Sequence, residues 1–260
     1  MGVLNVTPDS FSDGGCWYDA DRAVAHGQQL IADGADLLDV GGQSSRPGAR
    51  PVPAAEEARR VIPVIERLAA QTSVPISIDT CRASVARQAL DAGAQIINDI
   101  SALRADPAMV DVAVAAAVPV VLMHMRGTPL TMQQQTDYGD LIDTIRRFFD
   151  ARCAWAVQRG IARERMVLDP GIGFAKQPER DNQRIIDALP RLAGCGCPLL
   201  VGPSRKTFIA RLTGNETDAL DDGTAAAIAL AVDRGAHLVR VHNVRRMRRV
   251  VAVARSIAYL

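Results

Sequence analysis

The chain has 260 residues, of which 48% are hydrophobic, so it is long enough to bury a large core. Thirty Lys and Arg residues against 29 Asp and Glu residues give a net charge of +1, which excludes a strong overall attraction to nucleic acid or to an anionic membrane. No apolar run approaches the roughly 20 residues of a membrane span. The five cysteines include no CxxC pair, so we expect a cytoplasmic protein with reduced thiols.

Short apolar segments alternate with helix-length segments along the whole chain. The predicted strands lie near residues 2–5, 36–40, 75–79, 95–98, 118–123, 165–169, 198–202 and 237–241. Between them, apolar residues at three-to-four spacing predict helices over residues 21–33, 54–70, 82–92, 107–116 and 141–159. Glycines soon after several of these segments are typical of left-handed helix C-caps that lead into the next strand.

Eight strand–helix units in about 260 residues predict a single (β/α)₈ barrel domain over residues 1–260. A doubly wound open sheet is the alternative, but no GxGxxG motif follows the first strand. The first strand begins at residue 2 with nothing upstream to seal the barrel floor, which is consistent with a truncated start. The longest irregular segments are expected at residues 7–18, 42–53, 126–138 and 214–222.

Nearly every predicted strand ends on a polar residue that is able to bind a ligand. In a barrel of parallel strands these ends meet at one face, where barrel enzymes keep their active sites. The polar residues at the strand ends are Asn5, Asp39, Asp79, Asn98, His124, Asp169, Ser204 to Lys206, and Arg240 to His242. Taken singly, each could cap the following helix or brace a loop. Their recurrence at eight strand ends favours a common site.

Eight sequence motifs, in order from end to end, resemble the dihydropteroate synthase family: GVLNVTPDSFSDGG, DVGGQSSRPGA, SIDT, INDIS, LMHMRGTP, DPGIGF, GPSRKTFI and RVHNV. The resemblance implies a (β/α)₈ transferase of folate synthesis. Such an enzyme joins 6-hydroxymethyl-7,8-dihydropterin diphosphate to p-aminobenzoate and releases diphosphate. The resemblance also implies that Mg²⁺ is a cofactor, that sulfonamides inhibit the enzyme, and that the protein forms a homodimer through late helices.

The resemblance assigns the pterin pocket to residues that suit a ring edge of alternating donors and acceptors. Asp79, Asn98 and Asp169 would recognise that edge, with Lys206 and Arg240 also binding the pterin. Phe174 and Met123 would form the walls around the ring, although either could simply be core. The catalytic residues implied are Lys206, Arg240, His242, Asp79 and Asp169.

A leaving diphosphate needs cations and donors whose interactions strengthen as charge develops. Arg46, Arg240 and His242 suit this role, with Ser45 nearby, and the resemblance makes Asn5 a ligand of Mg²⁺. It also implies that two mobile loops frame the p-aminobenzoate pocket. The residues that would form this pocket are Phe11, Asp13, Ser45, Arg46, Pro47 and Ser204.

Four residues depart from the usual family pattern: Gln43 and Asn243 replace acidic residues, Ser45 replaces Thr, and Ala175 replaces Gly. We expect activity with changed loop packing and a less firmly oriented His242. The alternatives are a pterin-dependent methyltransferase, which would not need the SRK and RVH motifs, and a non-catalytic pterin-binding paralogue. The arginine cluster at residues 245–249 is expected to be a solvated helix face, so we predict no nucleic-acid partner and no membrane partner.

Overall fold

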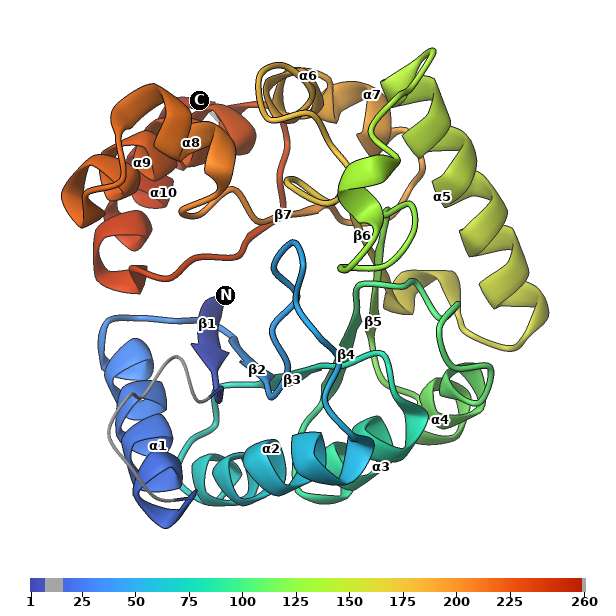
Figure 1. Cartoon of the computed structure of the whole chain (residues 1–260), viewed down its shortest axis with the longest axis vertical. Helices are drawn as coiled ribbons and strands as arrows, with labels where there is room; N and C mark the ends of the chain where they lie inside the picture. Colours follow the sequence, from blue (N-terminus) through green and yellow to red (C-terminus); the bar gives the residue numbers. More distant parts are fainter. Residues whose placement is uncertain (8–15, 259–260) are drawn as a thin grey trace.

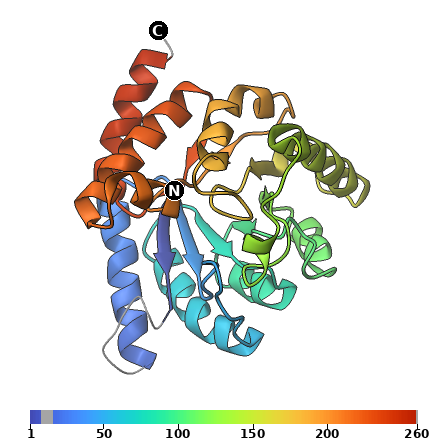
Figure 2. The same cartoon turned by 45° about the horizontal axis from the view of Figure 1, so that its top comes forward.

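Eight parallel strands surround the centre of the computed structural model, which describes residues 1–7 and 16–258. Helices lie outside them in a ring, so the chain returns to its starting point after one circuit (Figures 1 and 2). The strands are β1 (Gly2–Asn5), β2 (Leu38–Gly41), β3 (Ile76–Asp79), β4 (Ile96–Asp99), β5 (Val120–Met123), β6 (Met166–Asp169), β7 (Leu200–Val201) and β8 (Leu238–Val239).

The outer ring has one or more helices between each pair of successive strands. The helices are α1 (Cys16–Ala32), α2 (Ala54–Ala69), α3 (Ala83–Asp91), α4 (Met109–Ala116), α5 (Leu141–Gln158), α6 (Asp181–Asp187), α7 (Leu189–Ala193), α8 (Thr207–Thr213), α9 (Thr217–Asp233) and α10 (Val244–Ala258), with 3₁₀ turns η2 (Met132–Gln134) and η3 (Arg163–Arg165). None of the helices in the described ranges is both long and apolar enough to cross a bilayer.

Backbone pairing runs around the whole barrel. Strands β1 to β6 pair in sequence order, and β7 pairs with β8. Single bridges join Leu168 to Leu199 and Gly2 to Val241, which connect β6 to β7 and β8 to β1. Short β7 and β8 therefore complete a (β/α)₈ barrel, and the predicted fold class is confirmed.

Two apolar layers explain why this sequence forms a barrel. Helix α2 buries Val61, Val64, Ile65 and Leu68 at helical spacing against the outer faces of the strands. A smaller cluster joins Met1, Leu37, Val121 and Leu200, which lie at or just before β1, β2, β5 and β7 and meet inside the barrel. These side chains lie near the N-terminal ends of the strands. The barrel floor is thus filled, and the opposite ends are left for polar groups.

Most predicted elements are confirmed to within a few residues, but the prediction for one segment is wrong. An irregular stretch is expected over residues 214–222, whereas α9 already begins at Thr217. The Gly and Asp residues of this segment are typical of loops, so the sequence pattern did not indicate that a helix begins there. The difference matters because Asp221, on the first turns of α9, is buried in the folded chain.

Candidate active site

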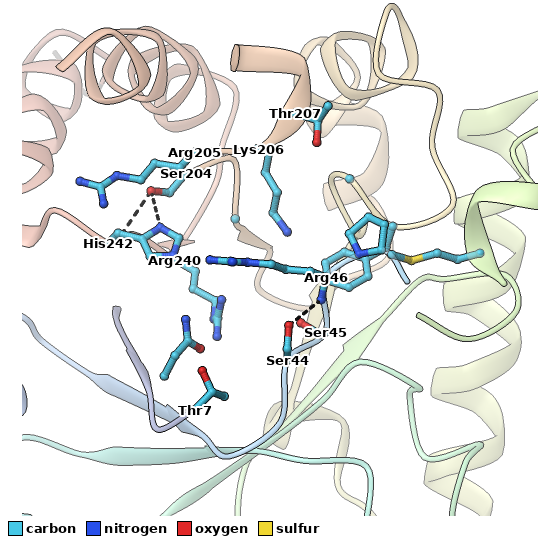
Figure 3. A pocket seen from close by; sticks show the side chains of 16 residues that line it. Thr7, Ser44, Ser45, Arg46, Ser204, Arg205, Lys206, Thr207, Arg240 and His242 are labelled. Atoms are coloured by element: carbon cyan, nitrogen blue, oxygen red, sulfur yellow. Dashed lines mark hydrogen bonds between the residues drawn. The ribbon is translucent and has the colours of Figure 1, made fainter. Parts of the chain in front are cut away.

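A cavity of about 550 Å³ opens at the C-terminal ends of the strands. Its walls come from β1, from the loop after β2, and from the segments that follow β6, β7 and β8 (Figure 3). The lining residues are Asn5, Thr7, Ser44, Ser45, Arg46, Pro47, Met132, Gly173, Phe174, Gly202, Ser204, Arg205, Lys206, Thr207, Arg240 and His242. Strand ends far apart in sequence therefore do meet at one site.

An inner compartment of about 30 Å³ lies beside this cavity, on the side of β3 to β6. Three polar strand-end residues line it, namely Asp79, Asn98 and Asp169. Its apolar walls are Ile100, Met123, Ile172 and Phe174. Lys206 and Arg240 line both spaces and so mark the junction between them.

Arg240 ties together two buried carboxylates at the base of the site. Its Nε donates to Asp39 Oδ2 at 2.6 Å and its Nη2 donates to Asp79 Oδ2 at 2.9 Å. Asn98 Nδ2 donates to the same Asp39 oxygen at 3.0 Å. Burial and the neighbouring Asp39 raise the pKa of Asp79 to about 7, against the opposing effect of Arg240.

Asp39 is a site residue whose role sequence reasoning missed. Its side chain is fully buried, and its Oδ1 has no hydrogen-bond partner within residues 1–7 and 16–258. Its position at a strand end was the available signal. Because it pairs with Arg240 across the barrel, it holds the guanidinium between the two compartments.

Asp169 ends β6 at the inner compartment. Its Oδ1 accepts the backbone N–H of Gly171 at 2.7 Å. Burial raises its pKa to about 6, partly offset by this hydrogen bond and by Lys206. Gly171 has φ +74°, and a Cβ there would lie 2.1 Å from the carbonyl oxygen of His124. The glycine in the DPGIGF motif is therefore required by the close approach of two backbones.

Lys206 reaches the junction from the segment before α8. Its Nζ lies 4.3 Å from the centre of the Phe174 ring, so cation and ring form one wall. Burial and the nearby Arg240 lower its pKa to about 8. The lysine is still mostly charged at pH 7, and an anion bound at the junction would favour the charged form further.

Ser204 and His242 pair on the far wall of the outer cavity, as the dashed lines in Figure 3 show. Ser204 Oγ lies 3.0 Å from His242 Nδ1, and it accepts the backbone N–H of His242 at 3.2 Å. Burial and Arg240 lower the pKa of His242 to about 3. The imidazole is therefore neutral at pH 7, so it can serve as a hydrogen-bond donor rather than as a cation.

The loop after β2 supplies the opposite wall. Arg46 extends across the cavity toward Arg240 and His242 (Figure 3), and Ser45 and Pro47 line the space beside it. Gln43 braces this loop by accepting the backbone N–H of Val52 at 3.1 Å. The predicted site residues Phe11 and Asp13 lie outside the described residues.

His124 is a strand-end residue that lies apart from the common site. It is buried away from both compartments, packs edge-on against Phe148 with 5.0 Å between ring centres, and its Nδ1 lies 3.1 Å from Lys176 Nζ. Lys176, which sequence reasoning missed, also donates to the carbonyl oxygens of Gly171 and Phe174. This buried lysine therefore braces the DPGIGF segment from behind.

The structure shows the surroundings of Asn243 and the backbone conformation of Ala175, two of the departures from the family pattern. Asn243 donates to Asp221 at 2.8 Å, and the His242 ring contacts Ser204, so the expected weaker orientation of His242 stays a prediction. Ala175 has φ +50°, a left-handed conformation that costs an L-residue free energy and that glycine would adopt freely.

Asn5 is the residue whose chemistry suits a metal ion beside the cavity. No group of three His, Cys, Asp or Glu side chains positioned for a metal occurs within the described ranges. Mg²⁺ is often held by one or two protein oxygens together with phosphate oxygens and water. A single amide oxygen at the edge of a cation-rich cavity fits such a substrate-assisted site.

The sequence and the structure match a consistent set of known proteins. A family described as pterin binding enzyme matches residues 1–242. Dihydropteroate synthase from Synechocystis is 48% identical over 256 residues, which is 98% of this chain and 88% of that protein. The crystal structure of Xanthomonas albilineans dihydropteroate synthase with 4-aminobenzoic acid has 47% identity, a TM-score of 0.93, and coverage of 100% and 93% of the two chains. For the Yersinia pestis dihydropteroate synthase with a sulfonamide drug complex, the identity is 40%, the TM-score 0.94 and the coverage 100% and 94%.

Proposed function

The chain belongs to the pterin binding enzyme family, and we propose that it acts as a dihydropteroate synthase, a transferase of folate synthesis. The reaction joins 6-hydroxymethyl-7,8-dihydropterin diphosphate to p-aminobenzoate, with loss of diphosphate. The observation that carries this proposal is the junction at Lys206 and Arg240. On one side lies a carboxylate-lined compartment, and on the other a cavity with donors for an anion. The methylene that links a pterin ring to its diphosphate falls between them.

The inner compartment is suited to the pterin edge. Asp169 and Asp79 accept hydrogen bonds from ring N–H groups, Asn98 offers both a donor and an acceptor, and Phe174 and Met123 cover the ring faces. An ionised carboxylate accepts hydrogen bonds through both oxygens, and Asp169, with a pKa of about 6, is mostly ionised at pH 7. We assign substrate recognition to these residues.

The outer cavity is suited to the departing diphosphate. Arg46 and Lys206 offer charge, whereas neutral His242 and Ser204 offer donors. The side chain of Arg240 is already paired with two aspartates, so its role is to fix the junction as much as to neutralise the leaving group. Bound Mg²⁺, held by Asn5, would supply further charge neutralisation on the diphosphate oxygens.

Bond breaking precedes bond making in the mechanism that we infer. As the C–O bond to diphosphate breaks, the electron-rich dihydropterin delocalises the positive charge on its methylene. The neutral arylamine of p-aminobenzoate then forms the C–N bond and loses a proton. No strong base is needed for this nucleophile, and the residues contribute chiefly position and charge stabilisation.

The p-aminobenzoate pocket is assigned to Ser45, Pro47 and Ser204, together with Phe11 and Asp13 outside the described residues. The complexes of related enzymes with 4-aminobenzoic acid and with a sulfonamide support this choice of ligands. A homodimer through late helices, a cytoplasmic location and a single domain over residues 1–260 belong to the same proposal.

The experiment that tests the function is incubation with dihydropterin diphosphate, p-aminobenzoate and Mg²⁺, with separate assays of dihydropteroate and diphosphate. We expect the two products in equal amounts, and suppression of both by excess chelator. Binding of both substrates without dihydropteroate formation would favour the non-catalytic paralogue. Full activity in excess chelator would reject Asn5 as a metal-site residue.

A further inference from the structure

The SRK segment contains a residue in an unfavourable backbone conformation. Arg205 has φ +55°, in the left-handed region, although it is not glycine. Arg205 lines the outer cavity together with its two neighbours, Ser204 and Lys206. The left-handed residue turns the chain so that the Arg205 side chain points away from the cavity, as Figure 3 shows, while Lys206 points into it. This turn must be held by other contacts.

Helix α9 supplies those contacts. The backbone N–H of Arg205 donates to Thr224 Oγ1 at 3.1 Å. Its guanidinium binds Asp221 with both arms, Nε to Oδ1 at 2.8 Å and Nη2 to Oδ2 at 3.1 Å. Asp221 has 2% of its side chain exposed. A planar, two-armed pair of this kind fixes orientation as well as distance.

The same carboxylate also holds the segment after β8. Asn243 Nδ2 donates to Asp221 Oδ2 at 2.8 Å, and Asn243 Oδ1 accepts the backbone N–H of Arg246 at the start of α10. The residue before Asn243 is His242, which pairs with Ser204. Asp221 therefore connects, from behind, the two segments whose front sides carry Ser204, Lys206 and His242.

Charge complementarity explains why Asn243 suits this chain. An Asp at this position would place a second carboxylate beside Asp221. The amide instead gives Asp221 a donor. Although burial acts to raise the pKa of Asp221, hydrogen bonds from Arg205 and Asn243 outweigh it and hold that pKa below its ordinary value.

We propose that Asp221 is a positioning residue for the diphosphate side of the active site, and that it acts by accepting hydrogen bonds from both Arg205 and Asn243. The proposal rests on the function proposed above. It predicts that Asp221 controls the placement of Ser204, Lys206 and His242 without contacting substrate. Lys206 also lines the pterin compartment, but Asp79, Asn98 and Asp169 there end β3, β4 and β6 and do not contact Asp221, so pterin binding should be less affected.

The test compares Asp221→Asn, Asn243→Asp and the double variant that exchanges the two residues. The control is Asp222→Asn, which removes an exposed carboxylate that pairs with Arg246 one position along the same helix. Turnover, binding of Mg²⁺-diphosphate and binding of a diphosphate-free pterin are measured for each variant, with thermal unfolding to confirm folding.

We expect each single change to lower kcat and diphosphate affinity by about 10- to 100-fold, because small displacements of reacting groups are costly. Pterin binding should stay within about threefold, and the exchange variant should recover most of the loss because its coupled residues restore one carboxylate and one amide. The control should match the wild type.

Equal losses of pterin and diphosphate binding would overturn the proposal, since they would indicate general damage. An exchange variant no better than the single changes would also overturn it, as would wild-type diphosphate binding in Asp221→Asn. Diphosphate binding is measured without turnover. A wild-type chain that binds diphosphate but forms no dihydropteroate would therefore reject the proposed function while the effect of Asp221 could still be read.

Discussion

Replacing Arg240 by Met should lower the free energy of unfolding far more than replacing an arginine in an ion pair of the same length at the surface. Arg240 lies 2.6 Å from Asp39, whose side chain is 0% exposed, and 2.9 Å from Asp79, whose side chain is 14% exposed. Arg67 lies at the same 2.6 Å from Asp21, but these side chains are 44% and 67% exposed. The two pairs differ mainly in burial.

The expected magnitude follows from what each change leaves behind. Without Arg240, two buried carboxylates face each other unpaired, and breaking a buried pair in this way costs about 3–5 kcal/mol. Without Arg67, the exposed Asp21 returns to water, and the loss should be about 0–1 kcal/mol. We therefore expect at pH 8 a drop of several kcal/mol in the free energy of unfolding for Arg240→Met, and little change for Arg67→Met.

The pH dependence gives an independent check. The folded-state pKa of Asp79 is raised to about 7, so between about pH 4 and pH 7 the folded state keeps a proton that the unfolded chain has lost. This contribution to stability is complete at low pH and is lost as the pH rises through about 7. Removing Arg240 raises that pKa further, so at pH 5 the carboxyl is neutral and the substitution should cost less.

The assay is urea unfolding of wild type, Arg240→Met and Arg67→Met at pH 5 and pH 8. Similar decreases in the free energy of unfolding for the two variants at pH 8 would refute the idea that burial sets the size of the decrease. A loss for Arg240→Met that is larger at pH 5 than at pH 8 would refute the assigned charge state of Asp79.

Three further predictions concern the ligand sites and the strained loop. Asp169→Asn should weaken pterin binding at least several-fold, because an unpaired buried donor costs about 1–3 kcal/mol. In the wild type, calorimetry should show that pterin affinity falls as the pH drops through about 6. Unchanged pterin binding by the variant would remove Asp169 from the site. Ala175→Gly should raise the free energy of unfolding by up to about 1 kcal/mol, because relief of the left-handed strain exceeds the added chain entropy; a loss like that of Ala156→Gly inside α5 would contradict this. Sulfonamides should bind appreciably only with Mg²⁺-diphosphate present, because diphosphate bound by Arg46 would order the loop that frames the sulfonamide pocket. Equal sulfonamide affinity without diphosphate would mean that the pocket is preformed.

The sequence by itself determined the barrel and the inner compartment. Strand and helix periodicity are local, and parallel strands deliver their C-terminal ends to one face, so sequence alone places Asp79, Asn98 and Asp169 together. The same reasoning includes Lys206 and Arg240, to which the motif resemblance gave roles, and both line the site.

The tertiary structure decided which charges meet. The partners of Arg240 are 201 and 161 residues away, and Asp221 meets Arg205 and Asn243 from different segments of the chain. Nothing local distinguishes Asp39 from a helix cap, His124 from a ligand, or Asp221 from a loop residue. Those roles are set only when the strands close into a ring, because closure fixes which polar groups share a low-dielectric space and must therefore pair.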